Sequence, residues 1–281
     1  MRKVTVVGSG VMGTGIAYAF SISGYDVCVN DINEQALNKA KENIYALMDG
    51  SVKKGYLKEE VYQSAKNNLK FESDLKMAAD GAELVIEAVL ERMDVKVDVF
   101  KQLDEICGPD TVLATNTSTM SPTEIGAQTS RPDKVVAMHF FNPVHKMKLI
   151  EVIRGLETSD ETMKYVHDTA AKINKTTVEV NEFPGFVTSR MNCLIGNEAM
   201  NLLMEGVASA EDIDNAMKLG LNHPMGPLEL ADLVGLDTRL RNMEYLYETL
   251  GEKYRPCPLL VKYVKAGRLG KKSGRGFYEY S

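Results

Sequence analysis

Short apolar runs alternate with longer amphipathic stretches through the first two thirds of the chain. The runs are rich in β-branched residues, whereas residues 33–48 and 93–106 carry apolar positions at helical spacing, with Pro109 just beyond the second stretch. This alternation predicts an α/β domain with a mostly parallel sheet whose strands are connected by helices. The predicted strands are residues 4–7, 27–30, 84–87, 112–114, 135–139, 149–153 and 177–180.

The pattern changes after the segment Pro184-Gly185-Phe186. A Pro-Gly pair is typical of a turn, and beyond it we find helical periodicity and no strand-like run. We therefore expect two domains, an α/β domain over residues 1–183 and an all-α domain over residues 184–281. With 281 residues, of which 44% are hydrophobic, the chain is long enough to bury both cores. The predicted helices of the second domain are residues 187–205, 210–219, 227–233 and 238–250.

Charge and cysteine content narrow the choice of partners and compartment. The chain has 33 basic and 39 acidic residues and a net charge of −6, without the basic cluster that a nucleic acid or an anionic membrane requires. We expect no signal or transit peptide, because the apolar start breaks into glycines within a few residues, and no run reaches the roughly 18 to 20 apolar residues that a spanning helix needs. The 4 cysteines include no CxxC pair, which favours reduced thiols over a zinc site. We expect a soluble cytoplasmic protein without nucleic-acid, membrane or metal partners.

A glycine-rich turn follows the first predicted strand. Its sequence, Gly8-Ser9-Gly10-Val11-Met12-Gly13, has the spacing GxGxxG and opens a predicted helix. The first glycine permits a tight turn, the second lets a pyrophosphate approach the backbone, and the third lets helix and strand pack closely. The N–H groups and the dipole of the helix N-terminus complement the phosphates. This context predicts a Rossmann-type domain whose glycine-rich segment binds a dinucleotide.

Asp31 ends the second predicted strand, 23 residues after Gly8. At this place a carboxylate accepts hydrogen bonds from the adenosine ribose and repels the 2′-phosphate of NADP. Residues 31–35 contain no arginine that would bind the extra phosphate. The alternative is that the glycines only form turns and that Asp31 caps the helix beginning near Asn33. We expect NAD(H) to be the cofactor.

His139 lies at the carboxyl end of the strand predicted at residues 135–139, the edge where open α/β sheets bind ligands. Glu151 follows 12 residues later on the next strand-like run. An imidazole exchanges a proton with a hydroxyl near neutral pH, and a carboxylate on its other nitrogen fixes the tautomer. A histidine at a strand end is more often structural, but this pair is the combination that alcohol dehydrogenation uses.

Asn116, Thr117 and Ser118 follow the strand predicted at residues 112–114 and should reach the same edge of the sheet. Short polar side chains there are suited to holding a substrate oxygen. Simple helix capping ahead of Pro122 is the alternative, and one segment can serve both purposes.

Taken together, these motifs resemble those of the L-3-hydroxyacyl-CoA dehydrogenase family, and within it the short-chain 3-hydroxybutyryl-CoA group of bacteria. The resemblance runs essentially from end to end. It implies NAD-dependent interconversion of (S)-3-hydroxyacyl-CoA and 3-ketoacyl-CoA, here 3-hydroxybutyryl-CoA and acetoacetyl-CoA, in fatty acid metabolism or butyrate fermentation. The matching blocks are residues 8–13, 87–88, 91–92, 116–118, 139–143, 147–149, 151–152, 184–186, 212–214, 216–220, 223–227, 270–274 and 276–278.

The resemblance also assigns roles to individual residues. It implies that His139 is the general acid or base, that Glu151 orients it, and that Ser118 donates a hydrogen bond to the C3 oxygen of the substrate. On sequence alone, the lysines among the implied cofactor contacts are almost as readily interpreted as solvated surface charges. The implied contacts are Glu91, Lys96, Asn116, Asn142 and Lys272.

Ser189 departs from the family pattern. Three residues after Pro184-Gly185-Phe186 the family typically has an asparagine, to which the resemblance assigns an active-site role. Serine is shorter than asparagine and lacks the amide donor. We expect the site to tolerate the change, with His139, Glu151 and Ser118 carrying most of the chemistry.

Two further partners are expected, the phosphates of the acyl-CoA and a second copy of the chain. An acidic protein needs a local basic patch to bind those phosphates, and Lys53 and Lys54 are the candidates, although a lysine pair is usually just solvated. The amphipathic helices of residues 184–281 can only partly cover one another's apolar faces. This predicts a homodimer or a larger homo-oligomer.

Two other classes of protein share parts of this pattern. β-Hydroxyacid dehydrogenases that act on non-CoA substrates combine similar domains but rely on a lysine of the helical part. A non-catalytic, crystallin-like relative would keep the fold and lose the catalytic pair. His139 and Glu151 are both present, which favours the acyl-CoA dehydrogenase.

Overall fold

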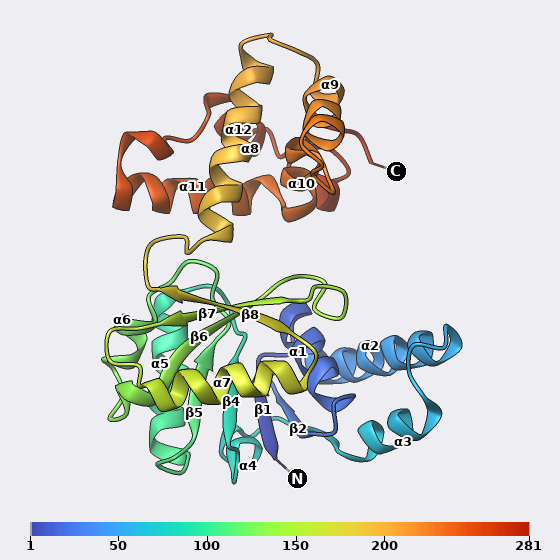
Figure 1. Cartoon of the computed structure of the whole chain (residues 1–281), viewed down its shortest axis with the longest axis vertical. Coiled ribbons are helices and arrows are strands. Elements are labelled where there is room, and N and C mark those ends of the chain that lie inside the picture. The colour runs from blue at the N-terminus through green and yellow to red at the C-terminus, as the bar shows by residue number, and fades with distance from the viewer. Residues whose placement is uncertain (1, 281) are drawn as a thin grey trace. The chain divides into compact units, whose positions relative to one another are not determined.

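The computed structural model of the chain describes residues 2–280 and divides into two compact units, Met1–Glu182 and Phe183–Ser281 (Figure 1). The first unit is a sheet with helices on both faces, and the second is built from helices. The predicted fold class, an α/β domain with a mostly parallel sheet followed by an all-α domain, is confirmed. Among residues 2–280 no helix is both long and apolar enough to span a membrane.

The sheet of the first unit has eight strands in the order β3-β2-β1-β4-β5-β6-β7-β8. Strands β1 to β6 pair in parallel, β7 runs antiparallel to β6, and β8 is parallel to β7. The first six strands therefore have the doubly wound order, which reverses direction between β1 and β4. The strands are β1 (Lys3–Val7), β2 (Asp26–Asn30), β3 (Leu69–Glu72), β4 (Leu84–Glu87), β5 (Val112–Thr115), β6 (Val135–Phe140), β7 (Leu149–Arg154) and β8 (Thr176–Asn181).

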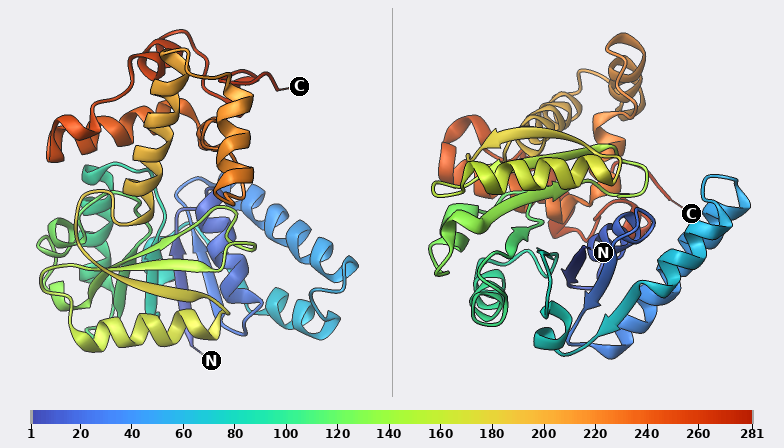
Figure 2. Two further views of the ribbon diagram at one scale, coloured as in Figure 1. Left: turned by 45° about the horizontal axis from the view of Figure 1, so that its top comes forward. Right: turned by 60° about the horizontal axis from the view of Figure 1, so that its bottom comes forward.

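Helices connect the strands and cover both faces of the sheet. Figures 1 and 2 show α7 lying along strands β7 and β8, while α1 lies beside β1 and β2 and α2 packs against α1 and β3. Strand β3 was not predicted, because two of its four residues are charged and the run is too short to show alternation. The helices are α1 (Val11–Ser21), α2 (Glu34–Lys53), α3 (Glu59–Asn67), α4 (Leu75–Ala79), α5 (Met93–Ile106), α6 (Pro122–Gly126) and α7 (Asp160–Lys172).

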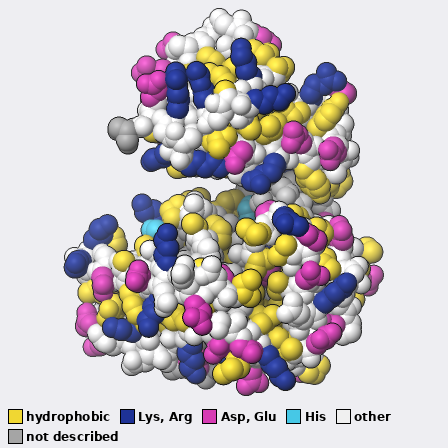
Figure 3. All heavy atoms as spheres, turned by 180° about the vertical axis from the view of Figure 1, so that it is seen from behind, with side chains coloured by type: hydrophobic (Ala, Val, Ile, Leu, Met, Phe, Trp, Pro, Cys, Tyr) yellow, Lys and Arg dark blue, Asp and Glu magenta, His cyan; other side chains and the backbone are white. Residues whose placement is uncertain are grey.

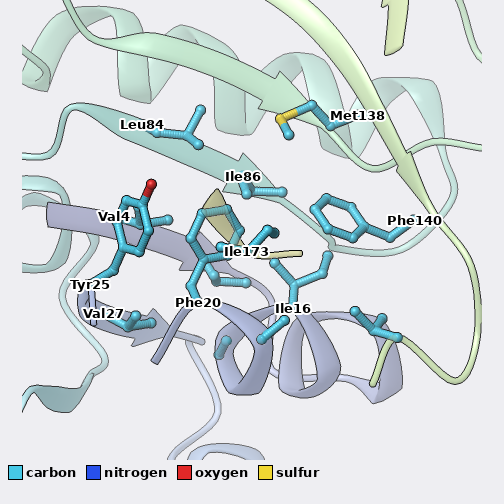
Figure 4. Packing of buried hydrophobic residues seen from close by; sticks show 14 of the residues in the cluster. Val4, Ile16, Phe20, Tyr25, Val27, Leu84, Ile86, Met138, Phe140 and Ile173 are labelled. Atoms are coloured by element: carbon cyan, nitrogen blue, oxygen red, sulfur yellow. The ribbon is translucent and has the colours of Figure 1, made fainter. Parts of the chain in front are cut away.

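Successive side chains of each strand point to opposite faces of the sheet, so the apolar residues form two clusters, one on each face. Side chains of β1 and β4 pack with α1, α2 and α7 on the first face, where Figure 4 shows Val4, Phe20 and Ile86 close together. The intervening residues, such as Val7 and Val85, pack with α4, α5 and α6 on the second face. Burial on both faces explains why most residues of the central strands are apolar.

The same alternation gathers four polar residues on the second face. Glu87, Thr115 and His139 each lie two or four residues after a strand residue of the second apolar cluster. Glu151 lies between two residues of β7 that pack on the first face. Because side chains alternate with a period of two, all four are directed to the face covered by α5 and α6. Three of them stand near the carboxyl ends of β4, β5 and β6.

The second unit consists of helices around a core of its own that includes Met200, Leu228 and Met243. The stretch predicted as one helix at 210–219 is α9 followed by a π-helical turn, Ala216–Gly220, and α12 was not predicted. On the face shown in Figure 3, basic and acidic side chains are interspersed over both units. The helices are α8 (Thr188–Met204), α9 (Ala210–Asn215), α10 (Pro227–Val234), α11 (Leu236–Leu250) and α12 (Pro258–Lys265).

Two buried carboxylates organise the second unit. Asp214 accepts hydrogen bonds of 2.9 Å from the N–H groups of Leu228 and Glu229 at the start of α10. Asp232 accepts hydrogen bonds of 3.0 Å from the N–H groups of Phe277 and Tyr278. The first carboxylate therefore caps a helix. The second fastens the C-terminal tail to α10.

Candidate active site

The glycine-rich turn between β1 and α1 is shaped by contacts that exclude side chains. Gly8 has φ of +101°, and a Cβ there would lie 2.6 Å from the carbonyl oxygen of Ala88. A Cβ on Gly13 would lie 1.8 Å from the carbonyl oxygen of Gly8. At Gly10, by contrast, no atom lies within 4 Å of the Cβ position. Gly8 and Gly13 are therefore required by packing, and Gly10 leaves room for a ligand to approach the backbone.

Asp31 is held at the end of β2 by three donors. Its Oδ2 accepts hydrogen bonds from the N–H (2.9 Å) and the Oγ (2.7 Å) of Ser9, and its Oδ1 accepts one from the N–H of Asn33 (3.0 Å). The helix α2 is capped by Asn33, whose side chain accepts the N–H groups of Gln35 and Ala36. The alternative role of Asp31 as the cap of this helix is therefore wrong. Ser9 instead ties the carboxylate to the glycine-rich turn.

A cavity of about 1060 Å³ opens at the carboxyl ends of β1 and β4, where the strand order reverses. Doubly wound sheets bind dinucleotides at this position. The first turn of α1 carries no acidic side chain, so its N–H groups favour phosphate. Lys39 of α2 also lines the cavity. The residues present therefore fit NAD. The lining includes residues 7–12, 30–33, 88–91 and 142–145.

Lys96 of α5 is completely buried, and its neighbours Val95 and Val99 line the cavity. Its Nζ is 2.8 and 3.0 Å from the two carboxylate oxygens of Glu87 and 3.0 Å from Oε2 of Glu91. Burial by itself lowers the pKa of Lys96, but the two carboxylates outweigh burial and hold the pKa above its usual value. The interpretation of Lys96 as a solvated surface charge is therefore wrong. Its ammonium bridges two carboxylates inside the domain.

Glu91 connects this buried lysine to the segment that follows β5. Its Oε1 accepts hydrogen bonds from Oγ1 of Thr117 (2.5 Å) and the N–H of Ser118 (3.0 Å), with Oγ of Ser118 at 3.5 Å. Burial raises the pKa of Glu91, yet the charge of Lys96 and these hydrogen bonds hold it below its usual value. Ser121, not Ser118, caps α6. The capping alternative for Ser118 is wrong, and its contacts lie with Glu91.

His139 and Glu151 face each other across the antiparallel pair β6 and β7. Nδ1 of His139 lies 2.8 Å from Oε2 of Glu151, and the two residues are 8% and 1% exposed. A carboxylate can only accept this hydrogen bond, so Nδ1 carries the proton. The ring of Phe141 lies against the imidazole, with 4.5 Å between the ring centroids. Tautomer and ring orientation are thereby fixed.

The amides predicted to contact the cofactor differ in their surroundings. Oδ1 of Asn116 accepts a hydrogen bond of 2.9 Å from the N–H of Phe140, which joins the end of β5 to β6. Asn142 is exposed and lines the cavity.

The two lysines predicted to bind the acyl-CoA phosphates, Lys53 and Lys54, are exposed at the C-terminal end of α2. The first unit therefore contains the histidine pair, the Glu91 network and the cavity.

The remaining predicted residues lie in the second unit. Ser189 is the second residue of α8 and is partly exposed. Lys272 pairs with Asp237, with 2.5 Å between Nζ and Oδ1. Its ammonium is therefore held by a carboxylate of the same unit.

Sequence reasoning missed three residues that shape the site. Glu87 anchors Lys96, Ser9 positions Asp31, and Val144 packs against α1. Glu87 could have been found, because it ends a predicted strand in the same way as His139. Residues 2–280 contain no group of three or more His, Cys, Asp or Glu side chains arranged to hold a metal ion.

Comparison with known proteins supports a single family. Residues 3–183 match the family described as 3-hydroxyacyl-CoA dehydrogenase, NAD binding domain, and residues 185–280 match 3-hydroxyacyl-CoA dehydrogenase, C-terminal domain. A probable 3-hydroxybutyryl-CoA dehydrogenase of Bacillus subtilis is 50% identical over 100% of this chain and 98% of its own length. A 3-hydroxybutyryl-CoA dehydrogenase of Clostridioides difficile is 48% identical over 99% of each chain.

Structural comparison agrees with these sequence matches. The crystal structure of (S)-3-hydroxybutyryl-CoA dehydrogenase from Ralstonia eutropha superposes with a TM-score of 0.96 at 45% identity, covering 100% of this chain and 99% of that one. The resemblance inferred from the motifs is confirmed. The chain belongs to the 3-hydroxyacyl-CoA dehydrogenase family.

Proposed function

We propose that this protein is an NAD-dependent dehydrogenase that interconverts (S)-3-hydroxyacyl-CoA and 3-ketoacyl-CoA, with 3-hydroxybutyryl-CoA and acetoacetyl-CoA as its preferred pair. The observation that carries the proposal is the buried contact of 2.8 Å between His139 and Glu151 at the ligand-binding edge of the sheet. The short-chain substrate is supported by the full-length relatives that bear this name.

His139 acts as the general acid or base. Because Nδ1 is committed to Glu151, Nε2 is the nitrogen that exchanges the proton with the C3 hydroxyl. The carboxylate stabilises the imidazolium that forms when the alcohol is oxidised, and the buried position of Glu151 strengthens this interaction. When bound, NAD supplies the hydride acceptor or donor at C3.

Ser118 holds the C3 oxygen of the substrate next to this acid or base. Glu91 and Lys96 set the position of its main chain through the N–H contact to Glu91. Glu91 follows β4, Ser118 follows β5, and Lys96 lies in α5, which packs on the face of the sheet to which His139 is directed. Orientation by such fixed groups lowers the barrier, because little freedom is left to lose during the reaction.

A cluster of positive charge supports the binding of the acyl-CoA phosphates. His145 lines the cavity, and burial together with Lys146, Lys175 and Lys54 holds its pKa below the usual value. Lys54 and Lys146 therefore concentrate positive potential at this part of the first unit, although the chain is acidic overall, whereas the ammonium of Lys175 is held by main-chain carbonyls. We place Lys53 and Lys54 in the patch that receives the CoA phosphates.

Oxidation of NADH with acetoacetyl-CoA, free acetoacetate and other 3-keto acids tests the proposal. We expect turnover with acetoacetyl-CoA, slower turnover with C6 and C8 3-ketoacyl-CoA substrates, and no turnover with the free acids. Turnover of the free acids would instead favour a β-hydroxyacid dehydrogenase. No turnover with any of them would favour a non-catalytic relative.

We also propose that the second unit forms a homodimer in the cytoplasm. It leaves large apolar side chains exposed, including Leu219 at 85% and Leu221 at 65%, which association would cover. All four cysteines are unbridged, as in a reducing compartment. Sedimentation as a monomer at micromolar concentration would contradict the dimer.

A further inference from the structure

Lys175 belongs to the turn between α7 and β8, yet its side chain reaches the loop that joins β6 to β7. Its Nζ donates hydrogen bonds to the carbonyl oxygens of Val144 (2.5 Å) and Met147 (2.6 Å), which lie 31 and 28 residues away in the chain. Among the residues that the structure describes, no ion pair involves Lys175. This half-buried ammonium therefore directs its donors to main-chain carbonyls of one loop.

The loop, residues 141–148, folds into a single turn. The carbonyl of Pro143 accepts hydrogen bonds from the N–H groups of Lys146 (2.9 Å) and Met147 (3.1 Å). The carbonyls of Val144 and Met147 accept no hydrogen bond within the turn and instead accept from Lys175. They resemble the last carbonyls of a helix, next to which a cation is favourable because it can donate hydrogen bonds to them. Beside this contact, the N–H of Thr176 donates to the carbonyl of Lys148 at 2.7 Å.

This loop forms part of the wall of the cofactor cavity. Asn142, Pro143 and His145 line the cavity together with the glycine-rich turn. Val144 is 3% exposed and packs on α1, where a Cβ at Gly15 would meet its Cγ2 at 2.9 Å. The position of the loop therefore sets the shape of the cavity close to the helix that receives the pyrophosphate.

We propose that Lys175 is a positioning residue for NAD binding, which holds the 141–148 loop against α1 so that the cavity is already shaped before the cofactor enters. The ammonium acts through the loop and not by touching the cofactor. His139 and Glu151 pair across the β6–β7 ladder, and Phe141 contacts the imidazole at the start of the loop, before the Val144 and Met147 carbonyls that Lys175 binds, so we expect the chemical step to depend little on Lys175. Pre-shaping of a site lowers the cost of binding, because less order has to be imposed when the ligand arrives.

The test compares three variants of the full-length protein. Lys175→Met removes the donors, Lys175→Arg keeps the charge and the donors, and Lys172→Met is a matched control at an exposed position at the end of α7. NADH binding is measured without acyl-CoA, so the result is independent of the identity of the substrate. We expect Kd to rise about 5- to 30-fold in Lys175→Met, less than the full effect of losing hydrogen bonds to a charged group, because the lysine acts on the cofactor only through the loop. The other two variants should stay within about threefold of the wild type.

Two further measurements separate positioning from general stability. Amide exchange at Lys146 and Met147 should accelerate in Lys175→Met, while the strands β1 and β4 keep their protection. The kcat at saturating NADH should remain within about twofold of the wild type. Unchanged NADH affinity in Lys175→Met would overturn the proposal. So would an equal loss of affinity in Lys175→Arg, or a loss of protection spread over the whole sheet.

Discussion

The buried lysine of the site provides the sharpest test of its electrostatics. Lys96 is completely buried and has three carboxylate oxygens within 3.0 Å, two from Glu87 and one from Glu91. The change Lys96→Met keeps the length and apolar stem of the side chain and removes its charge. Glu87, which is 0% exposed, is then left as a buried carboxylate without a cation.

The expected cost follows from that unpaired carboxylate. Removing one partner of a buried ion pair typically lowers the free energy of unfolding by about 3–5 kcal/mol, because the remaining charge is not solvated. Glu87 keeps two donors, the N–H of Val89 and Oγ1 of Thr115, both at 2.7 Å, so we expect a value near the lower limit. At roughly 2–4 °C per kcal/mol for a domain of this size, the melting temperature should fall by about 6–12 °C.

Thermal unfolding followed by calorimetry measures this change. Lys101→Met is the matched control, because Lys101 lies on the same helix and is exposed. The double change Glu87→Gln with Lys96→Met should recover most of the loss, because no buried charge remains unpaired. A fall of no more than about 2 °C in Lys96→Met would refute this reasoning, since that is the behaviour of a surface ion pair.

Three other changes test the proposed roles of single residues. His139→Gln should lower kcat at least about 100-fold and leave NADH affinity nearly unchanged, the scale of losing a general acid or base, and a variant that keeps most of its kcat would contradict this role. The kcat/KM with NADH should exceed that with NADPH by at least about 100-fold, because Asp31 opposes the 2′-phosphate. Asp31→Ser should lower this preference for NADH, because the repelling carboxylate is gone and Lys39, which lines the same cavity, can attract the 2′-phosphate. The same preference in the variant and the wild type would contradict the role of Asp31. Ser189→Asn should raise kcat/KM about two- to tenfold by adding a hydrogen-bond donor, whereas a tenfold drop would show a pocket reshaped around serine.

Much of the fold and part of the site could be predicted from local pattern alone. The spacing of Gly8, Gly10 and Gly13 between a strand and a helix is a local property, because the turn is made from those residues themselves. The pairing of His139 with Glu151 was also within reach. Both lie on neighbouring strands, and alternation with a period of two decides which face each side chain occupies.

Other properties depend on residues that are distant in the sequence, so only the tertiary structure decided them. Nothing near Lys96 in the sequence predicts its complete burial, which results from the packing of α5 against the second face of the sheet. In the sequence, Lys175 is an ordinary lysine before a predicted strand. Only the fold places its ammonium beside the loop of residues 141–148. The residue type, and with it the charge of the side chain, can be read from the sequence. The partners and the solvation of that side chain depend on helices, strands and loops that are distant in the chain and meet only in the fold.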